Sequence, residues 1–114
     1  LTAIRLGSIF SVLTVIETTL FQKQWPLYWT EEQRGNFAAY LAVHPNAGSV
    51  VPDSGGLRKV RWGLADRGKS GGVRVIYYIR NAQGELILLT LYAKSQIDNL
   101  TGAQLKEIFR ALEN

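Results

Sequence analysis

The chain has 114 residues, 46% hydrophobic and 19% charged, which is enough to bury the core of one domain and argues against disorder. It carries 13 Lys and Arg against 9 Asp and Glu, and this net charge of +4 is compatible with an anionic partner. No cysteine and one histidine occur in these residues, which excludes disulfides, thiolate metal sites, cysteine nucleophiles and two-histidine nuclease chemistry, and we expect neither a metal nor a cofactor.

The N-terminal stretch LTAIRLGSIFSVLTVIETTLF is apolar but contains too many polar residues for a helix that spans a membrane. The interrupting residues are Arg5, Ser8, Ser11, Thr14 and Glu17. We therefore expect a leader at residues 1–10, a single domain over residues 11–114, no membrane partner and a cytoplasmic location. The β-branched run SVLTVIE at residues 11–17 predicts the first strand.

Two helices are expected next. Spaced apolar residues over residues 18–29 predict a short helix that breaks near Pro26. The segment TEEQRGNFAAYLAVHP predicts a longer one, because Thr30 is a good N-cap and Gln33 can complete a capping box with it. Pro45 ends this helix, and the following NAGSVVPDSGG is expected to be a loop.

The second half of the chain predicts three strands and a helix. Residues 57–64, 73–80 and 86–93 read as strands joined by a glycine-rich basic connection and a turn, which favours an antiparallel meander. The last strand is continuously apolar, so we expect both of its faces to be covered. Thr101 can cap a C-terminal helix. The core-facing residues expected on this helix are Leu105, Ile108, Phe109 and Leu112.

This order of elements predicts a small α+β fold, in which an antiparallel meander is flanked by N-terminal helices and a C-terminal helix. We expect the helices to cover one face of the sheet.

Basic residues are concentrated in the predicted meander. Seven of the 13 lie between residues 57 and 80, against a single acid, Asp66. They are Arg58, Lys59, Arg61, Arg67, Lys69, Arg74 and Arg80.

Because side chains alternate along a strand, Lys59 and Arg61 should share one face, opposite Val60 and Trp62. If the strands pair in sequence order, Arg74 and the lysine after the third strand, Lys94, can join this pair. Clustered cations without nearby acids are unfavourable unless an anion is bound, and phosphate suits arginine best.

Simpler interpretations remain open at this point. A charged strand face is commonly just solvated, and tyrosines in a small sheet are commonly core or rim residues. At least one of Tyr77, Tyr78 and Tyr92 should nevertheless lie on the cationic face, where it can stack on a base. The segment GLADRGKSGG lacks the spacing of a phosphate-binding P-loop, and His44 at a helix end is expected to be structural.

Three blocks in this order, GGLRKVRW, GKSGGVRVIYY and LLTLYAKSQIDNLT, resemble toxins of the RelE/ParE superfamily. The resemblance is to the HigB-type branch in particular, with its pattern G-G-x-R-K, G-x-R-x-I-Y-Y and L-Y-x-K, and covers roughly residues 12–112. It implies a RelE-like fold and the toxin of a type II toxin–antitoxin system. Such a toxin is an mRNA interferase: a metal-independent endoribonuclease that cuts mRNA on the translating ribosome and is restrained by a cognate antitoxin, here a helix-turn-helix, HigA-like protein.

The resemblance also implies site residues. The positions that match the catalytic cations are Lys59, Arg61, Arg74 and Lys94, and the expected RNA-binding residues are Arg58, Lys69, Tyr78 and Tyr92. A C-terminal tyrosine used by some members has no match after Lys94, and Tyr92 and Tyr78 are the candidates to replace it.

In the expected mechanism the RNA 2′-hydroxyl attacks the adjacent phosphorus. Lys59 is the candidate base, since neighbouring cations favour the uncharged amine. Arg61 and Arg74 stabilise the phosphate charge, and Lys94 protonates the leaving oxygen or adds charge stabilisation. Two alternatives stay open because fold does not fix function: a ParE-like, non-enzymatic inhibitor of DNA gyrase, and an inactive nucleic-acid-binding homologue.

Overall fold

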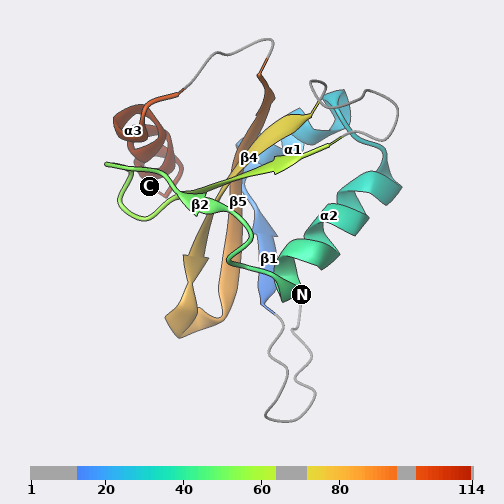
Figure 1. Cartoon of the computed structure of the whole chain (residues 1–114), viewed down its shortest axis with the longest axis horizontal. Helices are drawn as coiled ribbons and strands as arrows, with labels where there is room; N and C mark the ends of the chain where they lie inside the picture. The colour runs from blue at the N-terminus through green and yellow to red at the C-terminus, as the bar shows by residue number, and fades with distance from the viewer. Residues whose placement is uncertain (1–12, 64–71, 95–99, 114) are drawn as a thin grey trace.

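A five-stranded sheet forms the centre of the molecule, whose computed structural model describes residues 13–63, 72–94 and 100–113 (Figure 1). The strands are β1 (Thr14–Glu17), β2 (Ser49–Val50), β3 (Arg58–Trp62), β4 (Val73–Arg80) and β5 (Glu85–Ala93). Their order across the sheet is β1-β5-β4-β3-β2. β1 pairs with β5 in parallel and all other neighbours are antiparallel, so the sheet is mixed and the fold is α+β.

The expected antiparallel meander is confirmed as β3, β4 and β5. The bounds of β4 are those predicted from the sequence, and β5 begins one residue earlier than expected. The chain turns between β4 and β5 through a 3-10 helix, η3 (Asn81–Gln83), and Gly84. Gly84 has φ of 66°, a left-handed conformation that glycine adopts without a steric penalty.

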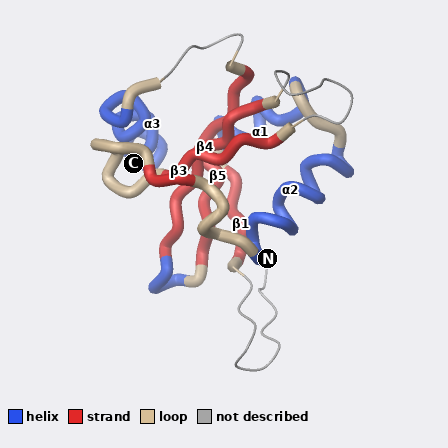
Figure 2. The backbone as a smooth tube through the Cα atoms, in the orientation of Figure 1, coloured by secondary structure: helices blue, strands red, loops and turns tan. Residues whose placement is uncertain are grey.

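The helices cover both faces of the sheet, so the expectation that they cover one face is wrong (Figure 2). They are α1 (Thr19–Gln24), the 3-10 helix η1 (Trp25–Leu27), α2 (Glu31–Val43) and α3 (Gly102–Glu113). Phe21 of α1 and Phe37 of α2 belong to one apolar cluster, whereas Leu105 of α3 belongs to a second cluster.

Strand β5 explains why both faces need cover. Leu88 and Leu91 enter the cluster beneath α1 and α2, while Leu89 and Tyr92 enter the cluster beneath α3. All four are at least 97% buried, which confirms the expected doubly covered position of this strand. Because burial of apolar side chains stabilises the fold, a strand that is apolar on both faces is most stable when both faces are covered.

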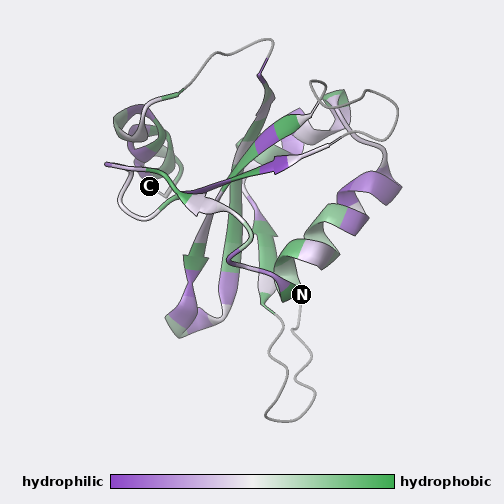
Figure 3. Ribbon diagram, viewed as in Figure 1, coloured by the Kyte–Doolittle hydropathy of each residue, from purple (hydrophilic) through white to green (hydrophobic). Residues whose placement is uncertain are grey.

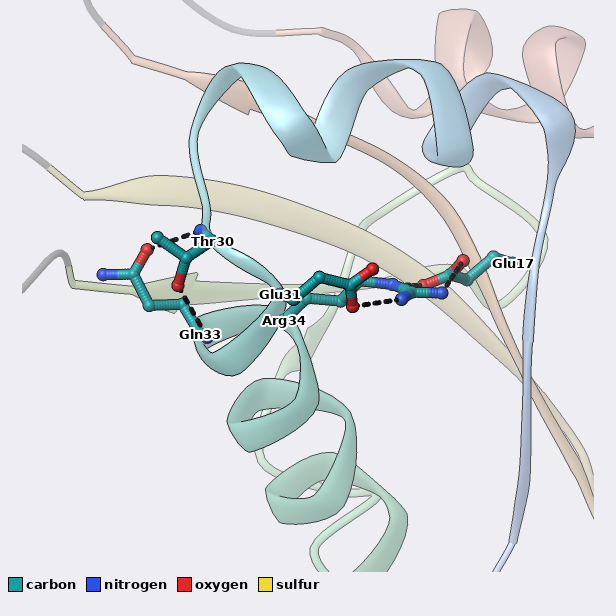
Figure 4. Close-up of polar contacts among 5 residues, drawn as sticks. All are labelled: Glu17, Thr30, Glu31, Gln33 and Arg34. Atoms are coloured by element: carbon teal, nitrogen blue, oxygen red, sulfur yellow. Dashed lines mark hydrogen bonds and ion pairs between the residues drawn. The ribbon is translucent and has the colours of Figure 1, made fainter.

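Helix α2 begins at the capping box that the sequence predicts. The Thr30 hydroxyl accepts a hydrogen bond from the Gln33 amide at 3.1 Å, and the Gln33 side chain accepts one from the Thr30 amide at 2.9 Å (Figure 4). The break of the preceding helix at Pro26 is also confirmed, because α1 ends at Gln24 and a 3-10 turn follows.

Arg34 ties α2 to the edge strand β1. Its Nε lies 2.6 Å from Glu17 Oε2 and its Nη2 lies 2.8 Å from Glu17 Oε1, while Nη1 reaches Glu31 at 3.1 Å (Figure 4). These hydrogen bonds, with Glu17 the main cause, raise the pKa of Arg34 above its usual value. The guanidinium also lies 4.6 Å above the Trp25 ring, so the charge is held by acid and aromatic partners together.

Two further expectations need correction. The segment expected to be only a loop contains β2, a strand of two residues that extends the sheet beyond β3. Leu112 is 39% exposed and lies outside the apolar cluster, because it stands in the last turn of α3, at the margin of the helix contact. Leu105, Ile108 and Phe109 do pack in or against that cluster, as expected.

The predicted leader at residues 1–10 lies outside the described residues, as does the glycine-rich connection expected at residues 65–72 except for Gly72. No helix in the described part of the chain has both the length and the apolar character needed to cross a bilayer.

Candidate functional site

A cavity of about 530 Å³ opens on the face of the sheet that carries α3. It is lined by Ala47, Ser49, Lys59, Val60, Arg61, Arg74 and Lys94. We call it the cationic cavity. The structure thus places the four cations singled out in the sequence, which come from β3, β4 and the end of β5, around one hollow.

The strand register explains how these side chains meet. Arg61 on β3 lies directly opposite Arg74 on β4, and Arg74 lies directly opposite Tyr92 on β5. Lys59 lies opposite Ser49 on β2. Directly paired residues project from the same face of a sheet. The register therefore brings the row of Arg61, Arg74 and Tyr92 and the pair of Lys59 and Ser49 to one surface.

Strand β3 alternates between this surface and the core. Its polar and apolar residues follow one another along the strand in Figure 3. Val60 is 8% exposed and, with Trp62, packs in the cluster beneath α1 and α2. The intervening Arg61 is exposed, as the sequence pattern predicts.

The charges of the cationic cavity are not compensated within the described residues. No Asp or Glu lines the cavity, and none of its four cations forms a side-chain hydrogen bond or ion pair with another described residue. The four cations repel one another when the cavity is empty, and a bound anion would relieve this repulsion.

Tyr92 adds a neutral donor beside the cations. It is 3% exposed, and its hydroxyl has no hydrogen-bond partner among the described residues. Burial raises the pKa of Tyr92, and the nearby positive charge of Arg74 only partly offsets that effect. The hydroxyl therefore keeps its proton at neutral pH. Tyr92 pairs with Arg74 in the register, but it is buried and does not line the cationic cavity.

Arg58 lies on the opposite face and has a different task. Its Nη1 donates to the Gly48 carbonyl at 2.7 Å, and the Gly48 amide donates to the Tyr77 hydroxyl at 2.9 Å. That hydroxyl in turn donates to the Pro45 carbonyl at 2.6 Å. These three bonds hold the segment of residues 45–48, which we call the wall segment, against the edge of the sheet.

The wall segment supplies a side of the cationic cavity that the sequence did not indicate. Ala47 belongs to it and Ser49 follows it, and both line the cavity. Small residues in a stretch expected to be loop give little signal for a site. The serine hydroxyl is identified only because β2 pairs with β3 and places it opposite Lys59.

The remaining predicted RNA contacts do not gather here. Tyr78 packs on Phe109 of α3 with ring centroids 5.0 Å apart, and it does not line the cationic cavity. Lys69 lies outside the described residues. In the described part of the chain, no three His, Asp or Glu side chains come together as a metal site would require.

Comparison with known proteins identifies the fold. No protein-family model matches the chain. A mutant of the E. coli toxin RelE in the free state is similar, with a TM-score of 0.56 and 9% identity over 90% of this chain and 95% of that one. The toxin–antitoxin complex RelBE2 from Mycobacterium tuberculosis is also similar, with a TM-score of 0.59 and 16% identity over 74% of this chain and 93% of the other. The fold of this chain is therefore RelE-like, a small α+β fold built on a five-stranded mixed sheet.

Proposed function

We propose that this protein is the toxin of a type II toxin–antitoxin system and that it cleaves mRNA on the translating ribosome. The observation that carries the proposal is the convergence of Lys59, Arg61, Arg74 and Lys94 on a cavity without a carboxylate among its described lining residues. The fold supports it, since the similar structures include the toxin RelE and a toxin–antitoxin complex.

The proposed reaction is an internal transesterification of RNA. The 2′-oxygen forms a bond to the adjacent phosphorus as the bond from phosphorus to the 5′-oxygen breaks, which leaves a 2′,3′-cyclic phosphate and a 5′-hydroxyl. Lys59 takes the proton from the 2′-hydroxyl, and Lys94 gives a proton to the departing 5′-oxygen. The two lysines line the cavity from different elements, Lys59 from β3 and Lys94 from the position after β5. An in-line displacement requires its base and its acid on opposite sides of the phosphorus.

Arg61 and Arg74 bind the phosphate between these lysines. Their guanidinium groups donate to the non-bridging oxygens, where negative charge grows in the transition state. The resemblance leaves the role of a C-terminal tyrosine to Tyr92 or Tyr78. Of these we assign it to Tyr92, which pairs with Arg74, and its buried hydroxyl would have to be uncovered to donate to the same phosphate.

The proposal includes partners and location. A cognate antitoxin, of the helix-turn-helix, HigA-like kind that goes with the HigB-type branch, restrains the toxin until it is removed. The ribosome positions the mRNA strand, so cleavage of naked RNA is expected to be slow. A toxin of this kind works in the cytoplasm, where translating ribosomes are found.

Induced expression of matched variants tests the proposal. The wild-type chain should arrest growth, and primer extension should map new mRNA 5′-ends within codons. Arg74→Ala should abolish both while its circular dichroism spectrum stays that of the wild type. Arg110→Ala, at an exposed arginine of α3, is the matched control and should behave as the wild type does.

Three outcomes would contradict the proposal. Growth arrest and cleavage by a folded Arg74→Ala variant would show that the cationic cavity is not the active site. DNA damage signalling without mRNA cleavage would identify a gyrase inhibitor. Salt-sensitive RNA binding without cleavage, by purified protein and on ribosomes, would identify an inactive homologue.

A further inference from the structure

Three aromatic rings lie on the face of the sheet that carries α2, across β3 from the cationic cavity, and no step of the proposed reaction uses them. Tyr40 on α2 contacts two other rings, with ring centroids 4.7 Å from His44 and 5.2 Å from Trp62. We call these three rings the aromatic row. Tyr40 is 41% exposed and His44 is exposed as well, so the outer end of the row is open to solvent.

The inner end of the aromatic row is fixed in the core. Trp62 packs edge-on against Phe37 at 5.1 Å, and Phe37 is fully buried. A tyrosine supported in this way loses little conformational freedom when a ligand stacks on it, which is the property that makes such rings good binding platforms. The row is therefore a supported surface rather than a loose side chain.

A second hollow adjoins the aromatic row and shares one lining residue with the cationic cavity. It measures about 390 Å³ and is lined by Tyr40, Val43, His44, Pro45, Asn46 and Ala47. Ala47 lines both hollows, so they meet at the wall segment. The bonds from Tyr77 and Arg58 to the wall segment fix the spacing between the two hollows.

From these observations we propose that the aromatic row binds an unpaired RNA base next to the phosphate held in the cationic cavity. The inference rests on the proposed function, since it assumes that RNA occupies that cavity. The strand would cross the edge of β3 at Ala47, where Arg61 faces one hollow and its neighbour Trp62 supports the other. Neither hollow has a carboxylate among its described lining residues, so a polyanionic strand meets no repulsion along this path.

Stacking on the aromatic row would be tolerant of sequence, because every base presents a π-face. Asn46 lines the same hollow with an amide that can donate and accept hydrogen bonds, which gives a route to a mild base preference. The aromatic row would therefore fix the conformation of the nucleotide next to the cleaved bond, and it would have little influence on which sequence is cleaved.

Fluorescence polarisation with a labelled single-stranded 2′-O-methyl hexaribonucleotide tests the inference. This probe cannot be cleaved, because it has no 2′-hydroxyl. Tyr40→Ala and Tyr40→Leu should each weaken binding by about 5- to 150-fold, the range expected for loss of one stacked base. Tyr40→Trp should retain binding, and Leu112→Ala, at an apolar side chain of similar exposure on α3, should not change it.

The salt dependence separates failure of this inference from failure of the proposed function. Tyr40→Ala should leave the slope of log affinity against log salt concentration unchanged. Arg61→Gln should reduce the magnitude of this slope by about one, the value expected for loss of one phosphate contact. If Arg61→Gln changes the slope and the Tyr40 variants bind as the wild type does, the cationic cavity holds RNA but the aromatic row does not. If Arg61→Gln has no effect on the slope, the proposed function itself fails. Tyr40→Leu binding as tightly as Tyr40→Trp would show a general apolar contact, as for a protein partner, and would overturn the inference.

Discussion

Arg61 on β3 and Arg74 on β4 lie directly opposite each other in the antiparallel register, on the face that lines the cationic cavity. Like charges at such positions destabilise a sheet by roughly 0.2–1 kcal/mol. No described carboxylate pairs with either arginine. The fold thus tolerates a repulsive pair at its candidate site, as proteins do where function needs a concentrated charge.

Arg61→Gln should therefore make the protein more stable and less active. We expect the free energy of unfolding in urea to rise by up to about 1 kcal/mol at low salt, and by less at high salt because ions screen the repulsion. Cleavage on ribosomes should fall by about 100-fold or more, as for loss of one group that stabilises transition-state charge. Arg110→Gln breaks only an exposed pair with Glu107 and should change neither quantity appreciably. A loss of stability in Arg61→Gln would show that this guanidinium makes a stabilising contact instead.

Tyr77 and Tyr92 offer a matched pair of phenylalanine substitutions. The Tyr77 hydroxyl accepts from Gly48 and donates to Pro45, so Tyr77→Phe should lower the free energy of unfolding by about 1–3 kcal/mol. The Tyr92 hydroxyl is buried without a described partner, so Tyr92→Phe should leave stability unchanged or raise it slightly. Urea unfolding at neutral pH measures both effects. If Tyr92 binds the phosphate, its variant should nevertheless cleave more slowly; equal cleavage rates would remove Tyr92 from the proposed site.

The same two tyrosines predict a loss of stability at alkaline pH. Burial raises the pKa of Tyr77 and of Tyr92 in the folded state, while the unfolded chain ionises near the usual value of about 10. The folded state thus holds these protons more tightly, so their contribution is fully present below pH of about 10 and is lost as the pH rises beyond it. Urea unfolding between neutral pH and strongly alkaline pH should show this fall, and Tyr92→Phe should make it shallower. An identical pH profile for the variant would contradict the prediction.

Gly48 and Gly35 make a second matched pair, this time for alanine. A Cβ atom at Gly48 would lie 2.8 Å from the Lys59 carbonyl oxygen and 2.9 Å from a ring carbon of Tyr77. Gly48→Ala should therefore cost about 1–3 kcal/mol of stability and displace the wall segment, which lowers cleavage as well.

Gly35 lies within α2, and a Cβ atom there would meet nothing within 4 Å apart from the backbone of its own helix. Gly35→Ala should therefore stabilise the helix by about 0.5–1 kcal/mol. Thermal unfolding of both glycine variants provides the measurement, and a stable, active Gly48→Ala protein would show that the wall segment can shift freely.

Local features were predictable wherever a short stretch of sequence contains all the information. The capping box of Thr30 and Gln33 needs only residues three positions apart, and β4 is defined by its own run of β-branched and aromatic residues. Strand alternation likewise placed Lys59 and Arg61 on one face before any partner strand was known. The expected RNA contacts of Arg58 and Tyr78 could not be judged in this way, because the partners of these side chains lie in the wall segment and in α3.

The sequence by itself determined the α-helices, every strand except β2, and the residues that carry the concentrated positive charge, because propensity, capping and side-chain alternation act over a few neighbouring residues. Only the tertiary structure decided that β1 joins β5 in parallel, that the helices divide between two faces, and that Arg61 meets Arg74. It also decided that the ring of Tyr40 contacts that of Trp62. These relationships join residues far apart in the chain, and they are fixed by which apolar surfaces must be buried together rather than by any local pattern.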